Sequence, residues 1–224
     1  MRIIITEPFR RKLKKLEKKY PSIFDNFQIR ESNIMQQEPV PLISETEYLE
    51  GERLSEIKHE YYQGEVFAMA GVSERHNLIV MNVIGELRYQ LKGKPCRPYP
   101  GDMRLKIEET GLYTYPDVMA VCGERQFGDE KQDTLLNPDV IIEVLSDSTE
   151  SYDRGNKFQN YRRIASLKEY VMISQKQRKI EKYARSHDGR WILSETDENH
   201  PAIFLESIGC ELELSEIYDK VDGF

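Results

Sequence analysis

The sequence of 224 residues predicts a mixed α/β fold, in which helices flank a β-sheet with both antiparallel and parallel strands. Three observations support this class. Short apolar runs such as residues 139–145 are typical of buried strands, and the amphipathic run from residue 74 to residue 92 is typical of a long helix. A helical pattern at residues 146–167 separates two strand patterns, and a crossover of that kind joins parallel strands.

The chain is expected to have three parts. Residues 1–28 predict a basic amphipathic helical extension, because their apolar residues recur at helical spacing. Residues 29–43 contain two prolines and no strong periodicity, which is typical of a linker. Residues 44–224 then form the main domain. The apolar face of the extension consists of Phe9, Leu13, Leu16 and Tyr20.

The first elements of the main domain are predicted from their boundary signals. Ser44 followed by Glu47 forms a capping-box pattern, which predicts a helix start. Gln63 and Gly64 separate two short strands as a hairpin turn would. Ser73 is expected to cap the long helix, and Gly93 to follow its end. The residues of this helix expected in the core include Leu78, Met81, Ile84 and Leu91.

Four further strands are expected before the C-terminal tail. Residues 103–107 alternate in polarity, and residues 114–122, 139–145 and 169–174 are apolar runs. We expect the first three to be joined by hairpin-like connections and the last to be reached through a helix that Ser148 or Thr149 caps. The tail predicts a hairpin around Asp188-Gly189 and a closing strand.

Composition and charge exclude several classes. Apolar runs of about six residues are too short to cross a membrane, and the N-terminus lacks a secretory signal pattern, so we expect a cytoplasmic protein. The three cysteines are widely spaced, which predicts reduced thiols with neither a disulfide framework nor a zinc site. Residues 1–30 carry a net charge of +6, and the remaining residues carry −13. A body this acidic is a poor general binder of nucleic acid, so such a role needs a local basic groove or metal ions.

Two proline-aspartate dipeptides, in TYPDV and in NPDVIIEVL, supply carboxylates beside apolar strands. Within the second stretch, Asp139 and Glu143 share one face of a strand but are about 13 Å apart. A divalent ion needs its oxygen ligands at about 2.0–2.6 Å, so these two acids cannot both bind one ion on a straight strand. Asp139 is therefore expected to cap the strand.

Asp117 and Glu143 satisfy the distance requirement if their strands pair as an antiparallel hairpin. A constant sum of 260 for paired residue numbers places these two acids opposite each other and centres the loop on residue 130. Directly opposed side chains have their Cβ atoms about 4.5–5.5 Å apart, close enough to share a metal ion. Glu143 lies within an apolar run, where a carboxylate is costly to bury unless it is paired or bound to metal.

Lys157 supplies a cation on the helix that follows the Glu143 strand. Asp153 and Tyr161 lie four residues to either side, on the same helical stripe. Because the helix begins near the end of that strand, Lys157 is expected to reach the acids. Asp102 is a further candidate ligand or orienting group, although the aspartate of a Gly-Asp pair is often only a turn residue.

These residues resemble a known pattern. The PD of TYPDV, the glutamate of IIEVL and a lysine displaced to the next helix are similar to the variant form of the PD-(D/E)XK nuclease superfamily; Leu145 stands at the usual lysine position. From about residue 44 onward, stretches such as EYLEGERLSEIKHEYYQGEVFAMAG and NPDVIIEVLSDSTESYDRGNKFQNYR resemble the Uma-two family of that superfamily. Residues 1–28 also resemble the opening of a RelE-like ribonuclease toxin, but the sheet of such a toxin does not follow.

The Uma-two resemblance implies a restriction-endonuclease-like fold and Mg²⁺- or Mn²⁺-dependent cleavage of DNA. The metal ligands would be Asp117 and Glu143, with Asp102 and the Val144 carbonyl as further candidates. Lys157 would orient water or offset charge, and Glu65 and His76 match family positions. Many nucleases of this fold act as dimers, so a homodimer is also implied. Two alternatives stay open: a nucleic-acid-binding or protein-interaction module with little catalysis, and a nuclease that cleaves RNA.

Overall fold

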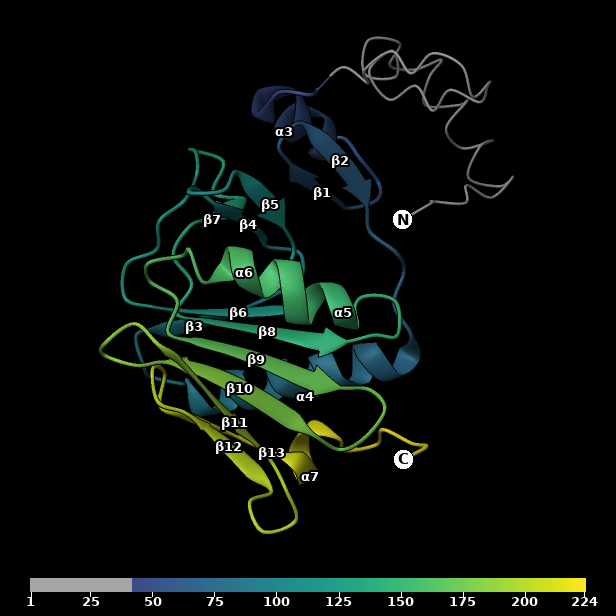
Figure 1. The fold of residues 1–224 in the computed structure, drawn as a ribbon, viewed down its shortest axis with the longest axis vertical. Helices are drawn as coiled ribbons and strands as arrows, with labels where there is room; N and C mark the ends of the chain where they lie inside the picture. The colour runs from purple at the N-terminus through teal and green to yellow at the C-terminus, as the bar shows by residue number, and fades with distance from the viewer. Residues whose placement is uncertain (1–41) are drawn as a thin grey trace.

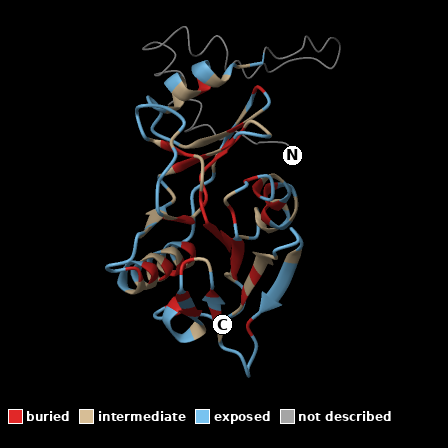
Figure 2. Ribbon diagram, turned by 90° about the vertical axis from the view of Figure 1, so that its left-hand side faces the viewer, coloured by how far each residue is buried: buried red, intermediate tan, exposed pale blue. Residues whose placement is uncertain are grey.

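A six-stranded mixed sheet lies at the centre of the molecule (Figure 1). The structure is a computed structural model that describes residues 42–224. The strand order of this sheet is β11-β10-β9-β8-β6-β3. Its strands are β3 Cys96–Pro100, β6 Val118–Cys122, β8 Val140–Leu145, β9 Glu169–Ser174, β10 Ile180–Arg185 and β11 Trp191–Glu195. Figure 2 shows that the buried residues concentrate along the central strands of this sheet.

The pairings at the centre of the sheet confirm the register predicted from the sequence. β6 and β8 are antiparallel, with Val118 opposite Ile142 and Ala120 opposite Val140, and each pair of residue numbers adds to 260. β8 and β9 are parallel, as the crossover requires. This register brings the residue before β6 level with Glu143 of β8.

Helices cover both faces of the sheet, and each face has its own core. One core joins α4 and α7 to the strands, and the other joins α6 to the opposite face. Since side chains alternate along a strand, Ile142 and Val144 of β8 face the first core, whereas Ile141 and Leu145 face the second. The helices are α3 Glu45–Glu52, α4 Glu74–Gln90, α5 Glu150–Tyr152, the π-helical turn η1 Asp153–Lys157, α6 Phe158–Tyr161 and α7 Leu214–Ile217.

A second sheet of five strands lies beside the α5–α6 face of the first (Figure 1). Its order is β2-β1-β5-β4-β7. The sequence predicted that residues 103–107 pair with the strand at residues 114–122, and this prediction is wrong. β4 turns tightly at Gly111, whose φ is 71°, and pairs with β5, while β3 takes the place beside β6. The strands are β1 His59–Tyr62, β2 Glu65–Ala68, β4 Arg104–Ile107, β5 Leu112–Thr114 and β7 Thr134–Leu135.

The local start and turn signals are confirmed. Ser44 and Glu47 form the capping box of α3. Gln63 and Gly64 form the turn between β1 and β2, and both have positive φ, as a tight hairpin turn requires. The Ser73 hydroxyl accepts a hydrogen bond from the backbone N–H of His76 and caps α4. These signals act within a few residues, which is why the sequence alone reveals them.

Three other local expectations need correction. The face of α4 that enters the core carries Ile79, Val83 and Leu87. Of the predicted core residues, Leu91 is buried and Leu78 and Ile84 pack against the core partly buried, whereas Met81 is 62% exposed. Thr149 occupies the cap position of α5, but its side chain makes no capping hydrogen bond. The tail closes with a hairpin, β12 Ala202–Leu205 and β13 Cys210–Glu213, followed by α7, where the sequence predicted a single strand.

The expectation that all three cysteines are reduced is also wrong. Cys96 and Cys122 form a disulfide, and Cys210 is free and buried. Cys96 lies directly opposite Cys122 in the β3–β6 ladder, so the strand pairing itself brings the two sulfur atoms together. Spacing along the chain could not indicate this contact, because 26 residues separate the two cysteines in sequence.

The predicted extension, residues 1–28, and most of the predicted linker, residues 29–43, lie outside the described residues. Within the part of the chain that the structure describes, none of the helices has both the length and the apolar character needed to cross a membrane.

Candidate active site

Asp117 and Glu143 meet where β6 begins beside β8. The Glu143 side chain points to the sheet face that α6 covers, because it has the same parity as Ile141 on β8. Asp117 lies in the bend directly before β6. The Asp117 backbone N–H approaches Glu143 Oε2 at 3.4 Å. Asp117 Oδ2 in turn accepts a hydrogen bond from the Val144 backbone N–H at 2.8 Å. The predicted hairpin register therefore places the two carboxylates next to each other.

Glu143 is almost completely enclosed, with 3% of its surface exposed. Its Oε1 atom accepts a hydrogen bond of 2.6 Å from the Tyr161 hydroxyl and lies 3.0 Å from the Lys157 ammonium. Burial raises the pKa of the Glu143 carboxyl above its ordinary value, and the nearby Lys157 charge opposes this rise. The carboxylate is thus held in a dry environment and is stabilised by one cation and one hydroxyl.

Lys157 lies among three carboxylates from three different elements. Its Nζ atom is 3.0 Å from Glu143 of β8, 3.3 Å from Asp153 of η1 and 3.8 Å from Glu60 of β1. Burial lowers the pKa of Lys157, but the surrounding negative charges more than offset this effect, so the pKa lies well above its ordinary value. The reach of Lys157 to Glu143 agrees with the expectation from the sequence. The π-helical geometry of η1 was not predicted, and such turns occur frequently at functional sites.

His76 approaches Asp117 from the opposite side of the sheet. It lies in the first turn of α4, and its Nε2 atom is 3.1 Å from Asp117 Oδ2. His76 is 7% exposed, and no hydrogen-bond partner in the described structure contacts its buried Nδ1 atom. Asp117 is therefore held by the Val144 N–H and the imidazole, while its side chain remains 22% exposed. The exposed part of Asp117 opens the site to solvent.

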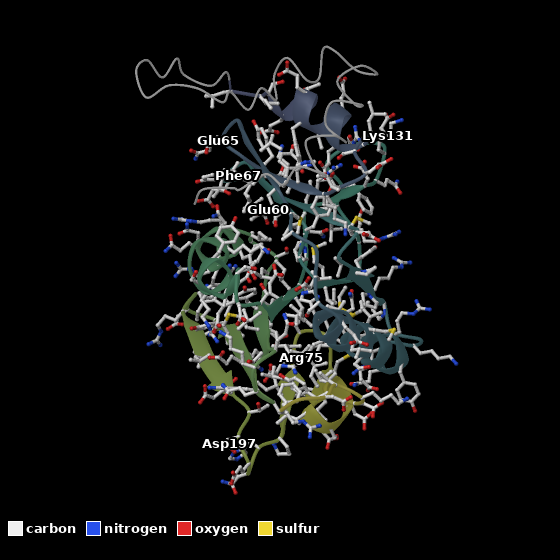
Figure 3. All side chains as sticks on the ribbon, turned by 90° about the vertical axis from the view of Figure 1, so that its right-hand side faces the viewer. Glu60, Glu65, Phe67, Arg75, Lys131 and Asp197 are labelled. Atoms are coloured by element: carbon white, nitrogen blue, oxygen red, sulfur yellow. A yellow bond between two sulfur atoms is a disulfide. The ribbon has the colours of Figure 1, made fainter. Side chains whose placement is uncertain are left out.

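The other predicted site residues lie apart from this cluster. Glu65, on β2, is exposed, and Figure 3 shows it at the outer side of its hairpin. The side chain of Asp102 is 85% exposed and pairs with Lys58. Asp139 has a structural environment, as the sequence indicated: its carboxylate accepts the Cys122 backbone N–H at 2.7 Å and pairs with Lys168 at 2.8 Å.

Glu60 is a member of the cluster that sequence reasoning missed. Its Oε1 atom accepts a hydrogen bond from the Thr114 hydroxyl, and its Oε2 atom accepts one of 3.1 Å from Tyr152. The sequence offered one signal, an acid next to the core residue Tyr61 in a predicted strand. That signal did not distinguish Glu60 from Glu65, because both acids occupy the same face of the hairpin.

The donor set suits a hard divalent cation. Carboxylate and carbonyl oxygens are the ligands that Mg²⁺ and Mn²⁺ prefer, and Mg²⁺ is commonly bound by one or two carboxylates together with water. Asp117 and Glu143 supply two such carboxylates, and Val144 follows Glu143 with its carbonyl. Within residues 42–224, no group of three or more His, Cys, Asp or Glu side chains is placed to hold one metal ion. The residues therefore fit a two-carboxylate, water-rich Mg²⁺ site and do not fit an all-protein cage.

Comparisons with known proteins agree with this geometry. Residues 45–215 match the Uma2 family model, described as "Putative restriction endonuclease". The uncharacterized Synechocystis protein slr1290 is 35% identical over 184 residues, which cover 80% of this chain and 93% of slr1290. The uncharacterized Synechocystis protein sll1609 is 37% identical over 154 residues, covering 69% and 87%.

A solved structure shows the same fold. It is the crystal structure of a putative nuclease of the DUF820 group from Anabaena variabilis, with a TM-score of 0.62 at 16% sequence identity. The match covers 75% of this chain and 93% of that protein. The mixed sheet with helices on both faces is thus restriction-endonuclease-like, as the sequence predicted, and the family supports a nuclease. The chain belongs to the Uma2 family.

Proposed function

We propose that this protein is a metal-dependent endonuclease that hydrolyses DNA phosphodiester bonds. One observation carries the proposal: Asp117 and Glu143, from adjacent strands, lie next to each other, and the buried ammonium of Lys157 is 3.0 Å from the second acid. A buried cation beside two acids, with one acid open to solvent, is suited to a reaction in which negative charge develops on a phosphate.

Asp117 and Glu143 are the residues that would hold Mg²⁺ or Mn²⁺, with the Val144 carbonyl as a further donor. A cation bound there supplies Lewis acidity toward a phosphate oxygen and lowers the pKa of a coordinated water. Lys157 donates hydrogen bonds to the oxygen on which charge accumulates, because its ammonium is fixed near the acids and screened from bulk water. Water attacks phosphorus and gives up a proton to solvent, the bond from phosphorus to the leaving oxygen breaks, and the leaving oxygen takes up a proton from solvent.

Two neighbours would position these groups without contacting the substrate. Tyr161 donates its hydroxyl hydrogen to Glu143 Oε1 and fixes the orientation of that carboxylate. His76 lies 3.1 Å from Asp117 Oδ2 and restricts the aspartate from the other side. With one oxygen of each acid held in this way, the remaining oxygens are oriented for a ligand, which reduces the entropy lost when a cation binds.

The test is a cleavage assay on single- and double-stranded DNA and RNA, with Mg²⁺, with Mn²⁺ or with a chelator. We expect metal-dependent nicking or cutting of DNA that falls at least 100-fold in Asp117→Asn, Glu143→Gln and Lys157→Met. Asp139→Asn is the matched control, since its aspartate belongs to the second proline-aspartate dipeptide but contacts Cys122 and Lys168; it should keep wild-type activity.

The same assay separates the alternatives. If only RNA is cleaved, the protein is a nuclease that acts on RNA and not on DNA. Binding of nucleic acid without cleavage under any metal condition would favour a binding module, a class that the net charge of −13 outside residues 1–30 makes worth testing. Full activity in both Asp117→Asn and Glu143→Gln would refute the proposed site.

A further inference from the structure

We infer that Glu60 is a positioning residue of this site and that it fixes the Lys157 ammonium from the second sheet. The inference rests on the proposed nuclease function, since it assigns Glu60 a role in that reaction. Its basis is a set of contacts that connects β1 to η1 across the boundary between the two sheets (Figure 1).

Strand alternation explains why Glu60 points toward the site. On β1, Tyr61 stacks with Tyr48 and lies edge-on to Tyr113, forming a small aromatic core on one face of the hairpin. Its neighbour Glu60 must point to the opposite face, which is directed toward η1. Figure 3 shows Glu60 further inside the molecule than Glu65. The Glu60 side chain is 13% exposed, so its charge is largely removed from water.

The contacts of Glu60 hold its carboxylate in place. Thr114, which is fully buried, donates its hydroxyl hydrogen to Oε1, and Tyr152 donates to Oε2 at 3.1 Å. Each oxygen therefore has a neutral hydrogen-bond donor, and neither donor cancels the negative charge. The nearby charge that can do so is Lys157, whose Nζ atom lies 3.8 Å from Oε1. A buried carboxylate of this kind exerts a strong pull on a neighbouring ammonium.

The direction of that pull gives Glu60 its role. Asp153 lies one helical turn from Lys157 and moves with it, whereas Glu143 is the acid proposed to hold the cation. Glu60 attracts the ammonium from a third element, away from Glu143. Without the Glu60 charge, Lys157 should pair more tightly with Glu143 and compete with a divalent ion for its oxygens. Glu60→Gln should therefore weaken both metal binding and turnover. Glutamine keeps the size of the side chain: its amide oxygen can accept a hydrogen bond from one of the Thr114 and Tyr152 hydroxyls, and its NH2 group can donate one to the other.

The matched control comes from the same hairpin. Glu65→Gln removes an identical charge from the same face of the hairpin, but at an exposed position next to the turn. Both variants are compared with wild type for kcat and KM in DNA cleavage, for Mn²⁺ affinity by calorimetry, and for thermal stability. We expect about tenfold lower kcat and about tenfold weaker Mn²⁺ binding in Glu60→Gln, with KM for DNA within twofold of wild type, and no change in Glu65→Gln.

The outcomes separate this inference from the function on which it rests. If wild type cleaves DNA and Lys157→Met does not, but Glu60→Gln retains wild-type kcat and Mn²⁺ affinity, the role of Glu60 is refuted and the nuclease stands. Equal losses in Glu60→Gln and Glu65→Gln would also refute it, because they would reflect net charge alone. If wild type cleaves no nucleic acid under any metal condition, both proposals fail.

Discussion

Replacing Lys157 by methionine should destabilise the fold substantially. The variant removes the buried ammonium but leaves the carboxylates of Glu143, Asp153 and Glu60 around an apolar side chain. Breaking a buried ion pair by removing one partner typically costs about 3–5 kcal/mol, because the other charge stays buried without compensation. For a domain of this size, that loss lowers Tm by roughly 6–20 °C, which leaves a folded protein if the wild type has ordinary stability.

The assay is urea unfolding and thermal melting, both in the presence of a chelator so that bound metal does not contribute. Lys176→Met is the matched control: Lys176 also pairs with an aspartate, Asp147, but the two side chains are 60% and 88% exposed, so the free energy of unfolding should change little. The double variant Lys157→Met/Glu143→Gln provides a second comparison. It removes the acid that lies nearest to the ammonium, at 3.0 Å, together with the cation, so it should recover about half of the lost stability.

Two results would refute this reasoning. If Lys157→Met and Lys176→Met cost the same, the burial of Lys157 contributes nothing to its pairing. If the double variant is no more stable than Lys157→Met alone, the uncompensated charge on Glu143 is not the cause of the loss.

Three further predictions concern the rest of the domain. Arg53 holds the pKa of Asp133 at about 2, a lowered value, so their pairing stabilises the fold above about pH 4 and the contribution is lost as pH falls toward 2. Because Asp133 is 35% exposed, Arg53→Ala should cost about 1 kcal/mol or less at pH 6, and urea midpoints measured down to pH 3 should show the difference from wild type shrinking. Gly64→Ala should lower the free energy of unfolding by more than about 1 kcal/mol, since φ is +90° and the new Cβ would lie 2.7 Å from Leu42 Cβ; an unchanged melting temperature would contradict this. Gly85 lies in α4, and no atom is within 4 Å of the Cβ that an alanine would add. Gly85→Ala should therefore raise the free energy of unfolding by about 0.5–1 kcal/mol in the same melting experiment.

The central pair of the site was predictable because two simple constraints determine it. In an antiparallel hairpin, the residue numbers of paired residues add to a constant. If Asp117 and Glu143 lie opposite each other, that constant is 260, which is the value in the structure. The caps at Ser44 and Ser73 were predictable for a different reason, because each depends on atoms within three residues of the cap.

What sequence reasoning missed depends on contacts between distant segments. Glu60 and Glu65 occupy the same face of one hairpin, and only the position of η1 against that hairpin separates the member of the cluster from the exposed acid. The same limit applies to α4, where the apolar Met81 lies outside the face that carries Ile79 and Val83 and packs against the sheet. The disulfide of Cys96 depends on which strand pairs with β6. The turn at Gly111 pairs β4 with β5, and β3 then lies beside β6.

The π-helical turn η1 makes the length of its segment a functional constraint. A π turn holds one residue more than an α turn, and each residue of a helix advances the direction of the side chains by about 100°. Deleting one residue, for example the half-exposed Gly155, would let an ordinary α-helix run from Glu150 to Tyr161. The shorter helix could still fold, but the angle around the helix axis between the Tyr152 and Lys157 side chains would change by about 100°. We therefore expect this segment to tolerate many substitutions at its exposed positions and no change in its number of residues.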